Sequence, residues 1–550
     1  MLMKNRIKKE DYPLLYDCAL KLYEKSRSDN LKNFPMSERR KYYINGNRND
    51  FEKLYFNRRD YLSATAILAL FDEEYIPELE KIMLAVCEEY CWALPAHTVG
   101  IKIADKKIID LFVAETGFVL SEICTVFSDS LSEKLILRVK AEIKKRVVNN
   151  YVRYRYWWEK CEMNWASVCG AYVGGTLLYL FPEVFQKHKS RILKTLECYI
   201  KGFSDDGFCL EGPLYWQYGF TAYTVFADLL YRYSDGKEDL FAHEKVKKIA
   251  CYGVNCLLKG NTALSFSDAD RSFRPDYALQ HFLHIKIPDK VSLPPADKLC
   301  FYDANTKWMN YYRAVLWSHS SAQSDSLRKE EIYSPSSHQL IINKPTFSFA
   351  IKGGDNDEPH NHNDLGSFIY SDKDSQVFCD LGSGRYTKDY FDDKKRYDIL
   401  CNSSLGHSVP IIDGKAQGYG KEFHAPLFYK NACALCNMTK AYSCEELISL
   451  ERKIDFYENS VHITDSFSFT RSIPVTERFV SLRKAELKDG ELIFGATKLK
   501  YPSKSAVLKI SEEKHTPHEY DTEDITVYCY DFILKGSINE ITFEIKTEEN

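Results

Sequence analysis

Two histidines separated by one residue mark the segment best suited to chemistry. Residues 353–370 read GGDNDEPHNHNDLGSFIY, so His360 and His362 stand in a turn-rich stretch before an apolar, strand-like tail. In extended backbone, residues i and i+2 project from one face, so both imidazoles could reach one metal. A stable site needs three or four ligands. Asp380 in VFCDLGSG and His407 in NSSLGHS are the next candidates along the chain.

Two stretches of the N-terminal half also carry polar and aromatic side chains. Asn164 and Trp165 occur in MNWASVCGAYVGG, where the asparagine either caps a helix or donates its amide to a ligand. Trp216 and Tyr218 follow an acidic, glycine-rich loop in DDGFCLEGPLYWQYGF. Such rings either belong to a core or stack on sugar faces.

The periodicity of the chain changes once along its length. From Tyr12 to about Thr306, apolar residues recur three and four apart, as in YLSATAILALF at 61–71, which predicts packed helices. From 336–354 onward, β-branched and aromatic residues alternate in short runs separated by turn residues, which predicts an all-β sandwich. We therefore predict a helical domain over 1–325 and a β domain over 326–550.

The motifs HNHNDLGSF at 360–368, DLGSGRY at 380–386, NSSLGH at 402–407 and IDGKAQ at 412–417 resemble the heparinase II/III family of polysaccharide lyases. The stretches around Asn164 and Tyr218 resemble the family in order and separation. The resemblance extends over roughly residues 90–420. It implies a multidomain α and β protein, with an incomplete α/α toroid followed by an antiparallel β-sandwich domain. Periodicity alone does not predict the toroid.

The resemblance also implies a reaction, the β-elimination of a glycan at a uronic acid to leave a 4,5-unsaturated uronyl end. The C5 proton becomes removable when an uncharged donor neutralises the sugar carboxylate, and Asn164 is the candidate for that role. Tyr218 would protonate the leaving oxygen, and in syn elimination it would first take the C5 proton. His360 would be the base in anti elimination. A basic tyrosine at neutral pH needs a nearby cation, for which Arg271 or Arg274 is the candidate.

The resemblance assigns the metal to His362, Asp380 and His407, whereas spacing alone would put His360 on the metal as well. Two histidines and one aspartate fit Zn²⁺ best, with Mn²⁺ or Ca²⁺ as alternatives, in a structural role. The remaining candidates are expected to bind substrate, although each has a structural alternative as a core, capping or surface residue. They are His97, Trp165, Trp216, Arg271, Arg274 and Asn402.

Composition limits the partners and the compartment. The formal net charge of -4 gives no overall attraction to nucleic acid, so an anionic oligosaccharide would need a local basic cleft. The sequence shows no apolar run long enough for a membrane span and no leader, and its 17 cysteines are scattered, which favours a reduced, cytoplasmic protein. Homo-oligomer formation stays open. Cys433 and Cys436 form a C-x-x-C without a second ligand pair.

Glycosaminoglycan fragments such as heparan, chondroitin or hyaluronan are the expected substrates, with alginate-like oligouronates next. A first rival function is a glycoside hydrolase on an α/α toroid, which would need two carboxylates and a water. Asp205, Asp206 and Glu211 are the candidate carboxylates. A second rival is a carbohydrate-binding protein without catalysis.

Overall fold

The computed structural model describes residues 7–27, 34–99, 105–300, 307–317, 329–392, 395–518, 523–536 and 538–548. The chain divides into two compact units. The helical unit comprises Met1–Gly202, Gln217–Ala250 and Pro275–Asp325, and the β unit comprises Phe203–Trp216, Cys251–Arg274 and Ser326–Asn550. The predicted border between residues 325 and 326 lies outside the described residues. The segments 203–216 and 251–274, which the prediction gave to the helical domain, belong to the β unit.

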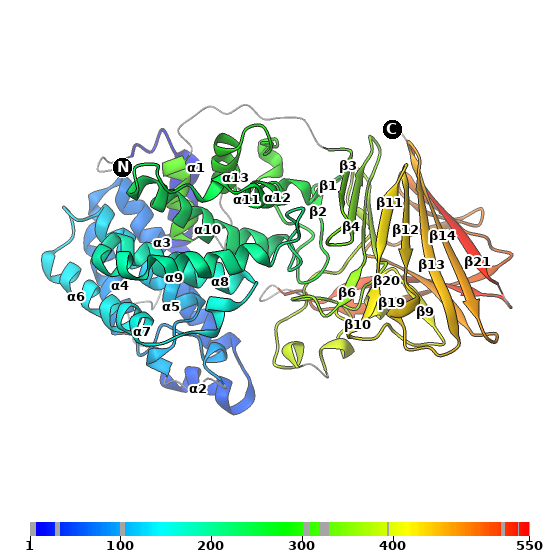
Figure 1. Cartoon of the computed structure of the whole chain (residues 1–550), viewed down its shortest axis with the longest axis horizontal. Coiled ribbons are helices and arrows are strands. Elements are labelled where there is room, and N and C mark those ends of the chain that lie inside the picture. Colours follow the sequence, from blue (N-terminus) through cyan, green and yellow to red (C-terminus); the bar gives the residue numbers. More distant parts are fainter. Residues whose placement is uncertain are drawn as a thin grey trace. The chain divides into compact units, whose positions relative to one another are not determined.

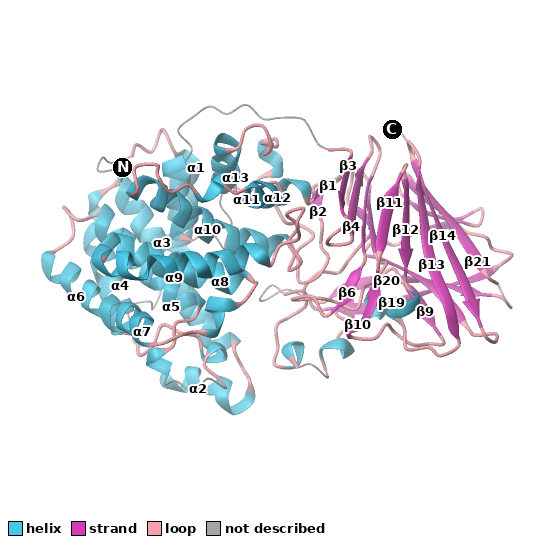
Figure 2. Ribbon diagram, viewed as in Figure 1, coloured by secondary structure: helices cyan, strands magenta, loops and turns pink. Residues whose placement is uncertain are grey.

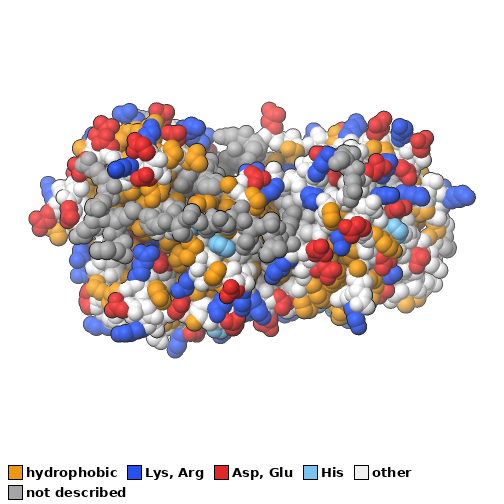
Figure 3. Space-filling view, turned by 90° about the horizontal axis from the view of Figure 1, so that it is seen from above, with side chains coloured by type: hydrophobic (Ala, Val, Ile, Leu, Met, Phe, Trp, Pro, Cys, Tyr) orange, Lys and Arg blue, Asp and Glu red, His pale blue; other side chains and the backbone are white. Residues whose placement is uncertain are grey.

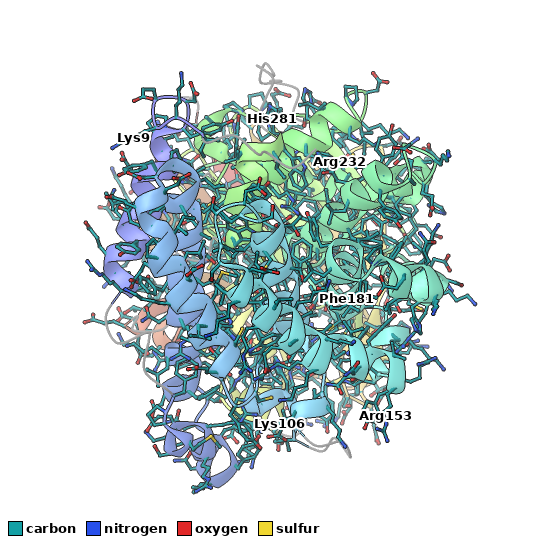
Figure 4. All side chains as sticks on the ribbon, turned by 90° about the vertical axis from the view of Figure 1, so that its left-hand side faces the viewer. Lys9, Lys106, Arg153, Phe181, Arg232 and His281 are labelled. Carbon is teal, nitrogen blue, oxygen red and sulfur yellow. The ribbon has the colours of Figure 1, made fainter. Side chains whose placement is uncertain are left out.

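The helical unit is built from helices packed against one another (Figures 1 and 2). Its helices are α1 (Pro13–Ser26), α2 (Met36–Asn45), α3 (Asn49–Phe71), α4 (Ile76–Glu88), α5 (Leu111–Val126), α6 (Glu133–Ile143), α7 (Asn149–Arg153), α8 (Asn164–Leu180), α9 (Pro182–Lys201), α10 (Pro213–Tyr233), α11 (Glu244–Ala250), α13 (Tyr277–Lys286) and α14 (Trp308–Trp317). The first four residues of α10 lie in the β unit. Helices α3 and α4, and α8 and α9, pack as hairpins. Phe181, labelled in Figure 4, is the connecting residue between α8 and α9.

Helices α5 and α8 pack against each other and are buried along nearly their whole length. A helix that is apolar on every side belongs in a core, which explains why both lack a polar face. Small residues permit the close approach. A Cβ atom on Gly175 would lie 2.5 Å from the ring of Phe118, and one on Gly174 would lie 2.6 Å from Phe226. The glycines of α8 are therefore required for packing.

A buried ion pair ties α14 to α5. The Glu122 carboxylate accepts two hydrogen bonds from Arg313, at 2.8 and 3.0 Å, and one from the Trp308 indole at 2.8 Å. The hydroxyl of Tyr179 on α8 donates a fourth at 2.7 Å. Because every polar atom of the carboxylate is bonded, the charge is tolerated in the core and fixes how the three helices meet.

The β unit contains antiparallel sheets, in agreement with the predicted fold class. The five-stranded sheet has the order β3 (Glu331–Ser334), β4 (Gln339–Asn343), β5 (Ser348–Lys352), β7 (Phe368–Ser371), β8 (Gln376–Phe378). The eight-stranded sheet has the order β11 (Leu427–Lys430), β12 (Cys433–Asn437), β13 (Leu447–Phe456), β14 (Ser460–Phe469), β21 (Glu540–Thr547), β18 (Thr497–Lys500), β17 (Glu491–Phe494), β16 (Glu486–Lys488).

The four-stranded sheet has the order β19 (Ala506–His515), β20 (Ile525–Leu534), β15 (Val475–Ser481), β9 (Pro410–Ile412). Phe479 of this sheet joins all three large sheets. Its ring lies 5.1 Å from Phe368, 5.2 Å from Phe378 and 4.7 Å from Phe543. Aromatic rings at these separations contribute both buried area and favourable edge contacts. The sheets therefore share one core.

A short helix and a hairpin of the β unit come from the earlier part of the chain. Helix α12 (Tyr252–Asn255) precedes a hairpin of β1 (Leu257–Leu258) and β2 (Thr262–Ala263). A further pair joins β6 (Gly354–Asn356) to β10 (Gly420–Ala425). The hairpin is a departure from the expected helices up to residue 306, and it leads directly into residues 267–274.

Charged side chains of both signs are interspersed over the face in Figure 3, in keeping with the small net charge of -4. Within the described part of the chain, no helix combines the length and the apolar character needed to cross a bilayer.

Candidate active site and metal centre

The structure brings His362, Asp380 and His407 together in the β unit. All three side chains are fully buried, and their nearest ligand atoms lie within 4.8 Å of one another. His407 Nδ1 and Asp380 Oδ2 lie 3.0 Å apart, and neither of them nor His362 Nδ1 makes a well-aligned hydrogen bond to a described residue. Buried polar atoms are rarely left unpaired, so three that face one point fit a bound cation. This is the donor set that the sequence predicts.

Hydrogen bonds at Nε2 of His362 and of His407 orient the two imidazoles for metal binding through Nδ1. His362 Nε2 bonds Asp268 Oδ1 at 3.0 Å, and His407 Nε2 bonds the carbonyl oxygen of Cys401 at 2.8 Å. Both acceptors hold the proton on Nε2, which leaves the Nδ1 lone pairs for a metal. Two imidazoles and one carboxylate, completed by water, fit zinc.

Removal of metal gives a direct test of this centre. Chelation should lower the free energy of unfolding by about 3 kcal/mol relative to protein with free Zn²⁺ at about 100 times its Kd. The measurement is a thermal or urea melt with and without chelator. His407→Ala should be insensitive to zinc, whereas His462→Ala, on β14 and half-exposed, should respond as the wild type does. A zinc response in His407→Ala equal to that of the wild type would refute the assignment.

His360 does not share the metal site. It has a φ of +59° in a turn, so the extended geometry expected for residues 360–362 is wrong. Its Nδ1 donates instead to Asp268 Oδ2 at 2.8 Å. The prediction from spacing alone, that His360 and His362 bind the same metal, therefore does not agree with the structure. The left-handed backbone turns the two rings toward opposite oxygens of one carboxylate.

Asp268 is the centre of this cluster and was not predicted. Besides the two histidines, its buried carboxylate accepts hydrogen bonds from the hydroxyls of Tyr386, at 3.2 Å, and Tyr390. Burial raises the pKa of Asp268, but the hydrogen bonds from His360 and His362 outweigh burial and hold it well below the usual range. Asp268 lies in SDADRSF at 267–273, and no motif or spacing in the sequence distinguishes it as a site residue. Its hydrogen-bond partners come from distant parts of the chain.

Tyr215 orders His360 from the opposite side. Its ring stacks on the imidazole with centroids 4.1 Å apart at 21°. Its hydroxyl bonds the Tyr386 hydroxyl at 2.7 Å, and Tyr386 in turn bonds Asp268. The contacts form a closed ring through His360, Asp268, Tyr386 and Tyr215. Such a ring compensates for the strained backbone at His360.

The protonation of His360 is set by opposing effects. Burial lowers its pKa, but the hydrogen bond and charge of Asp268, with the charge of Glu211, raise it above the ordinary histidine value. Glu211 Oε1 lies 4.0 Å from His360 Nε2. With Nδ1 occupied by Asp268, Nε2 is the atom suited to exchange a proton with a ligand.

In the helical unit, Tyr218 on α10 donates its hydroxyl to Glu115 Oε2 at 3.3 Å. Burial and then the Glu115 charge raise the pKa of Tyr218 well above its ordinary value. Arg271 and Arg274 belong to the β unit, so the expectation that one of them lowers this pKa stays a prediction. Tyr218 is held as a protonated phenol, the form that acts as an acid.

Asn164 is the first residue of α8 and is buried. The cap residue is Met163, so the capping alternative for Asn164 does not hold. His97 Nδ1 bonds Asp110 Oδ2 at 2.8 Å, and its ring lies 4.9 Å from Trp165. Asp110 also caps α5. His97 therefore has a structural partner and still contacts a predicted binding residue.

Not every predicted sugar-stacking tryptophan is accessible. Trp216 is completely buried and packs against Tyr252 and Gly253, so its assignment as a stacking surface is wrong. Trp165 is half-buried, and its ring lies 4.9 Å from that of Trp157, which is 53% exposed. These two rings are the accessible ones.

The last predicted binding residues lie in the β unit. Arg274 is exposed, and Arg271 is half-buried. Burial and the Arg271 charge lower the pKa of His515 to about 4. Asn402 is fully buried, its carbonyl oxygen accepts from Asn363 N at 3.0 Å, and its Nδ2 has no hydrogen-bond partner among the described residues. Asn402 therefore helps to hold the loop that carries His362.

Two further sequence signals are resolved by the structure. Asp206, a candidate hydrolase acid, accepts hydrogen bonds from Ser334 at 3.0 Å and Ser336 at 2.8 Å, which is a structural role. All 17 cysteines are free thiols. Cys433 and Cys436 lie three residues apart on β12, so they point to opposite faces and do not form a joint site.

The chain has the fold of the heparinase-like polysaccharide lyases, with a helical region followed by antiparallel sheets. It is similar to heparinase III, with a TM-score of 0.65 at 14% identity over 90% of this chain and 77% of that chain. It is similar to heparan sulfate lyase HepC from Pedobacter heparinus, with a TM-score of 0.60 at 13% identity over 92% of this chain and 77% of that one.

A third similar structure is the chondroitin AC lyase of Streptomyces coelicolor A3 in complex with chondroitin sulphate. Its TM-score is 0.55 at 9% identity, over 98% of this chain and 83% of that chain. No protein-family model and no curated protein sequence matches the chain. At sequence identities this low, the structural similarity establishes a shared fold and nothing further.

Proposed function

We propose that the protein is a polysaccharide lyase that cleaves uronate-containing glycans by β-elimination, with glycosaminoglycan fragments as substrates. The observation that carries the proposal is the His360–Asp268 pair in a chain with this fold, at 2.8 Å. A histidine anchored through Nδ1 by a buried carboxylate is a proton acceptor with a fixed direction. The similar structures include lyases described as acting on heparan sulfate and on chondroitin.

Each of the three predicted catalytic residues has one part in the reaction. Asn164 donates its amide to the substrate carboxylate and so stabilises the charge that develops when the C5 proton leaves. His360 Nε2 takes that proton. The C4–O4 bond then breaks, a C4=C5 double bond forms, and the Tyr218 hydroxyl gives its proton to O4. Burial and the Glu115 charge keep Tyr218 protonated before reaction, which is the state that an acid needs.

His362, Asp380 and His407 would hold a divalent metal, zinc in the first place. When bound, the ion supplies a cross-link between buried loops and no proton transfer. Asp268 hydrogen-bonds both His362 and His360, so it supports the metal ligand and the base at once. A reducing compartment, the cytoplasm, belongs to the same proposal, since all 17 cysteines are free thiols.

Ultraviolet absorbance tests the function directly. The protein is incubated with heparan, chondroitin, hyaluronan and alginate fragments, and the absorbance of the conjugated double bond is followed together with product masses. We expect absorbance to rise with at least one glycosaminoglycan. Products carrying an added water without absorbance would establish a hydrolase, and binding without any product would establish a carbohydrate-binding protein. Either result would refute the lyase.

A further inference from the structure

A buried ion pair lies against the hydroxyl of Tyr218. The Glu115 side chain on α5 is 7% exposed, and Lys307 Nζ contacts its Oε1 at 3.0 Å and its Oε2 at 3.3 Å. Tyr218 donates to the same Oε2 at 3.3 Å. One carboxylate therefore holds both the phenol and the ammonium group. Neither Glu115 nor Lys307 has a part in the reaction as proposed above.

Aromatic rings surround the Lys307 ammonium group. It lies 5.4 Å from the ring centroid of Phe112, 5.7 Å from Tyr218 and 5.8 Å from Phe56. Aromatic faces attract a cation, more strongly where water is reduced. The charge is thereby held beside the Tyr218 ring, although the Lys307 side chain remains 25% exposed.

Negative charge would accumulate at this point during the proposed reaction. When Tyr218 gives its proton to O4, a phenolate forms next to the Glu115 carboxylate. Like charges this close repel strongly in a partly buried site. Asp60 is near the same lysine, since burial raises its pKa to about 6 and the charges of Lys307 and Lys25 oppose that rise. A cation is needed here for the proton transfer to be favourable.

We infer that Glu115 and Lys307 are positioning residues for proton donation by Tyr218, an inference that rests on the proposed function. Glu115 fixes the direction of the O–H group and keeps the phenol protonated before reaction. Lys307 balances the phenolate that forms as O4 takes the proton and C4–O4 breaks. The phenolate then recovers a proton from water.

A second ion pair of the helical unit provides the matched control. Lys286 Nζ contacts Asp239 Oδ2 at 3.0 Å, its side chain is also 25% exposed, and it lies 4.1 Å from the ring of Tyr231. The lysine has the same exposure and the same kind of partners as Lys307, its carboxylate partner is more exposed (33% against 7%), and the described interactions include no contact with Tyr218. Lys286→Met therefore reports what the loss of such an ion pair does to the fold alone.

The test compares two leaving groups. One substrate is a glycan fragment that the wild-type protein cleaves. The other is a synthetic uronide with nitrophenol at O4, and this leaving group departs without protonation. Lys307→Met should lower kcat on the glycan about 100-fold, because general acid assistance is lost, and should leave kcat on the nitrophenyl substrate within about threefold. Lys286→Met should change neither. If Lys307 had a purely structural role, Lys307→Met would lower kcat on both substrates by similar factors.

Two further variants complete the experiment, with thermal melts on each protein. Lys307→Arg keeps the charge and should keep most of the glycan activity. Adding Glu115→Gln to Lys307→Met should recover about tenfold on the glycan, because no carboxylate then opposes the phenolate. Equal losses on both substrates, or a loss in Lys307→Arg as large as in Lys307→Met, would overturn the inference alone. A wild-type protein that eliminates neither substrate would overturn the proposed function and the inference with it.

Discussion

Replacing Tyr218 with phenylalanine should lower the rate of glycan elimination about 1,000-fold. The variant loses one oxygen atom, which is the proton donor in the proposed reaction, while the ring keeps its place on α10. The departing sugar would then leave as an unprotonated alkoxide, which is a poor leaving group. The measurement is the initial rate of absorbance increase, together with substrate affinity by calorimetry, which should be nearly unchanged.

Tyr231→Phe provides the control for this prediction, because Tyr231 is on the same helix and 39% exposed. Its activity should equal that of the wild type. On the nitrophenyl uronide, Tyr218→Phe should also remain close to the wild type, since that leaving group needs no proton. Full turnover of glycan by Tyr218→Phe would show that another group is the acid.

Replacing Asp268 with asparagine should damage two properties at once. The amide has one accepting oxygen in place of two, and its NH₂ group would face a donor on His360 or His362. We expect kcat to fall about 100-fold or more, and zinc affinity to fall about 10- to 100-fold, as happens when a hydrogen-bond partner of a metal ligand is removed. Zinc affinity is measured by competition with a chromophoric chelator.

Asp372→Asn is the matched control for Asp268→Asn. Asp372 is also fully buried in the β unit, and it accepts from Arg483 at 2.7 Å and from Thr497 at 3.1 Å. This variant should lose stability and keep its zinc affinity. If Asp268→Asn binds zinc as tightly as the wild type does, Asp268 does not support the metal ligand. Tyr218→Phe separates the two effects, because it should lose activity and keep zinc.

Local patterns in the sequence predicted most elements of secondary structure, and the family resemblance of short motifs predicted the candidate metal-binding residues. Apolar residues three and four apart predicted the helices, as in YLSATAILALF at 61–71, which lies within α3. Alternation predicted strands such as β14 and β21, in which buried and more exposed residues alternate, because this pattern is a property of a few consecutive residues. His362, Asp380 and His407 were found through short motifs, and the structure brings them within 4.8 Å.

Other features depend on residues far apart in the chain, and only the tertiary structure decided them. Asp268 lies 92 residues from His360 and 94 from His362, and Glu115 lies 192 residues from Lys307. The burial of Trp216 and the left-handed turn at His360 likewise follow from packing. Propensity and periodicity act over a few residues, whereas a buried carboxylate selects its donors from whatever the folded core places around it. The sequence alone therefore determined which chemical groups are available, and the fold decided which of them share a proton or a metal.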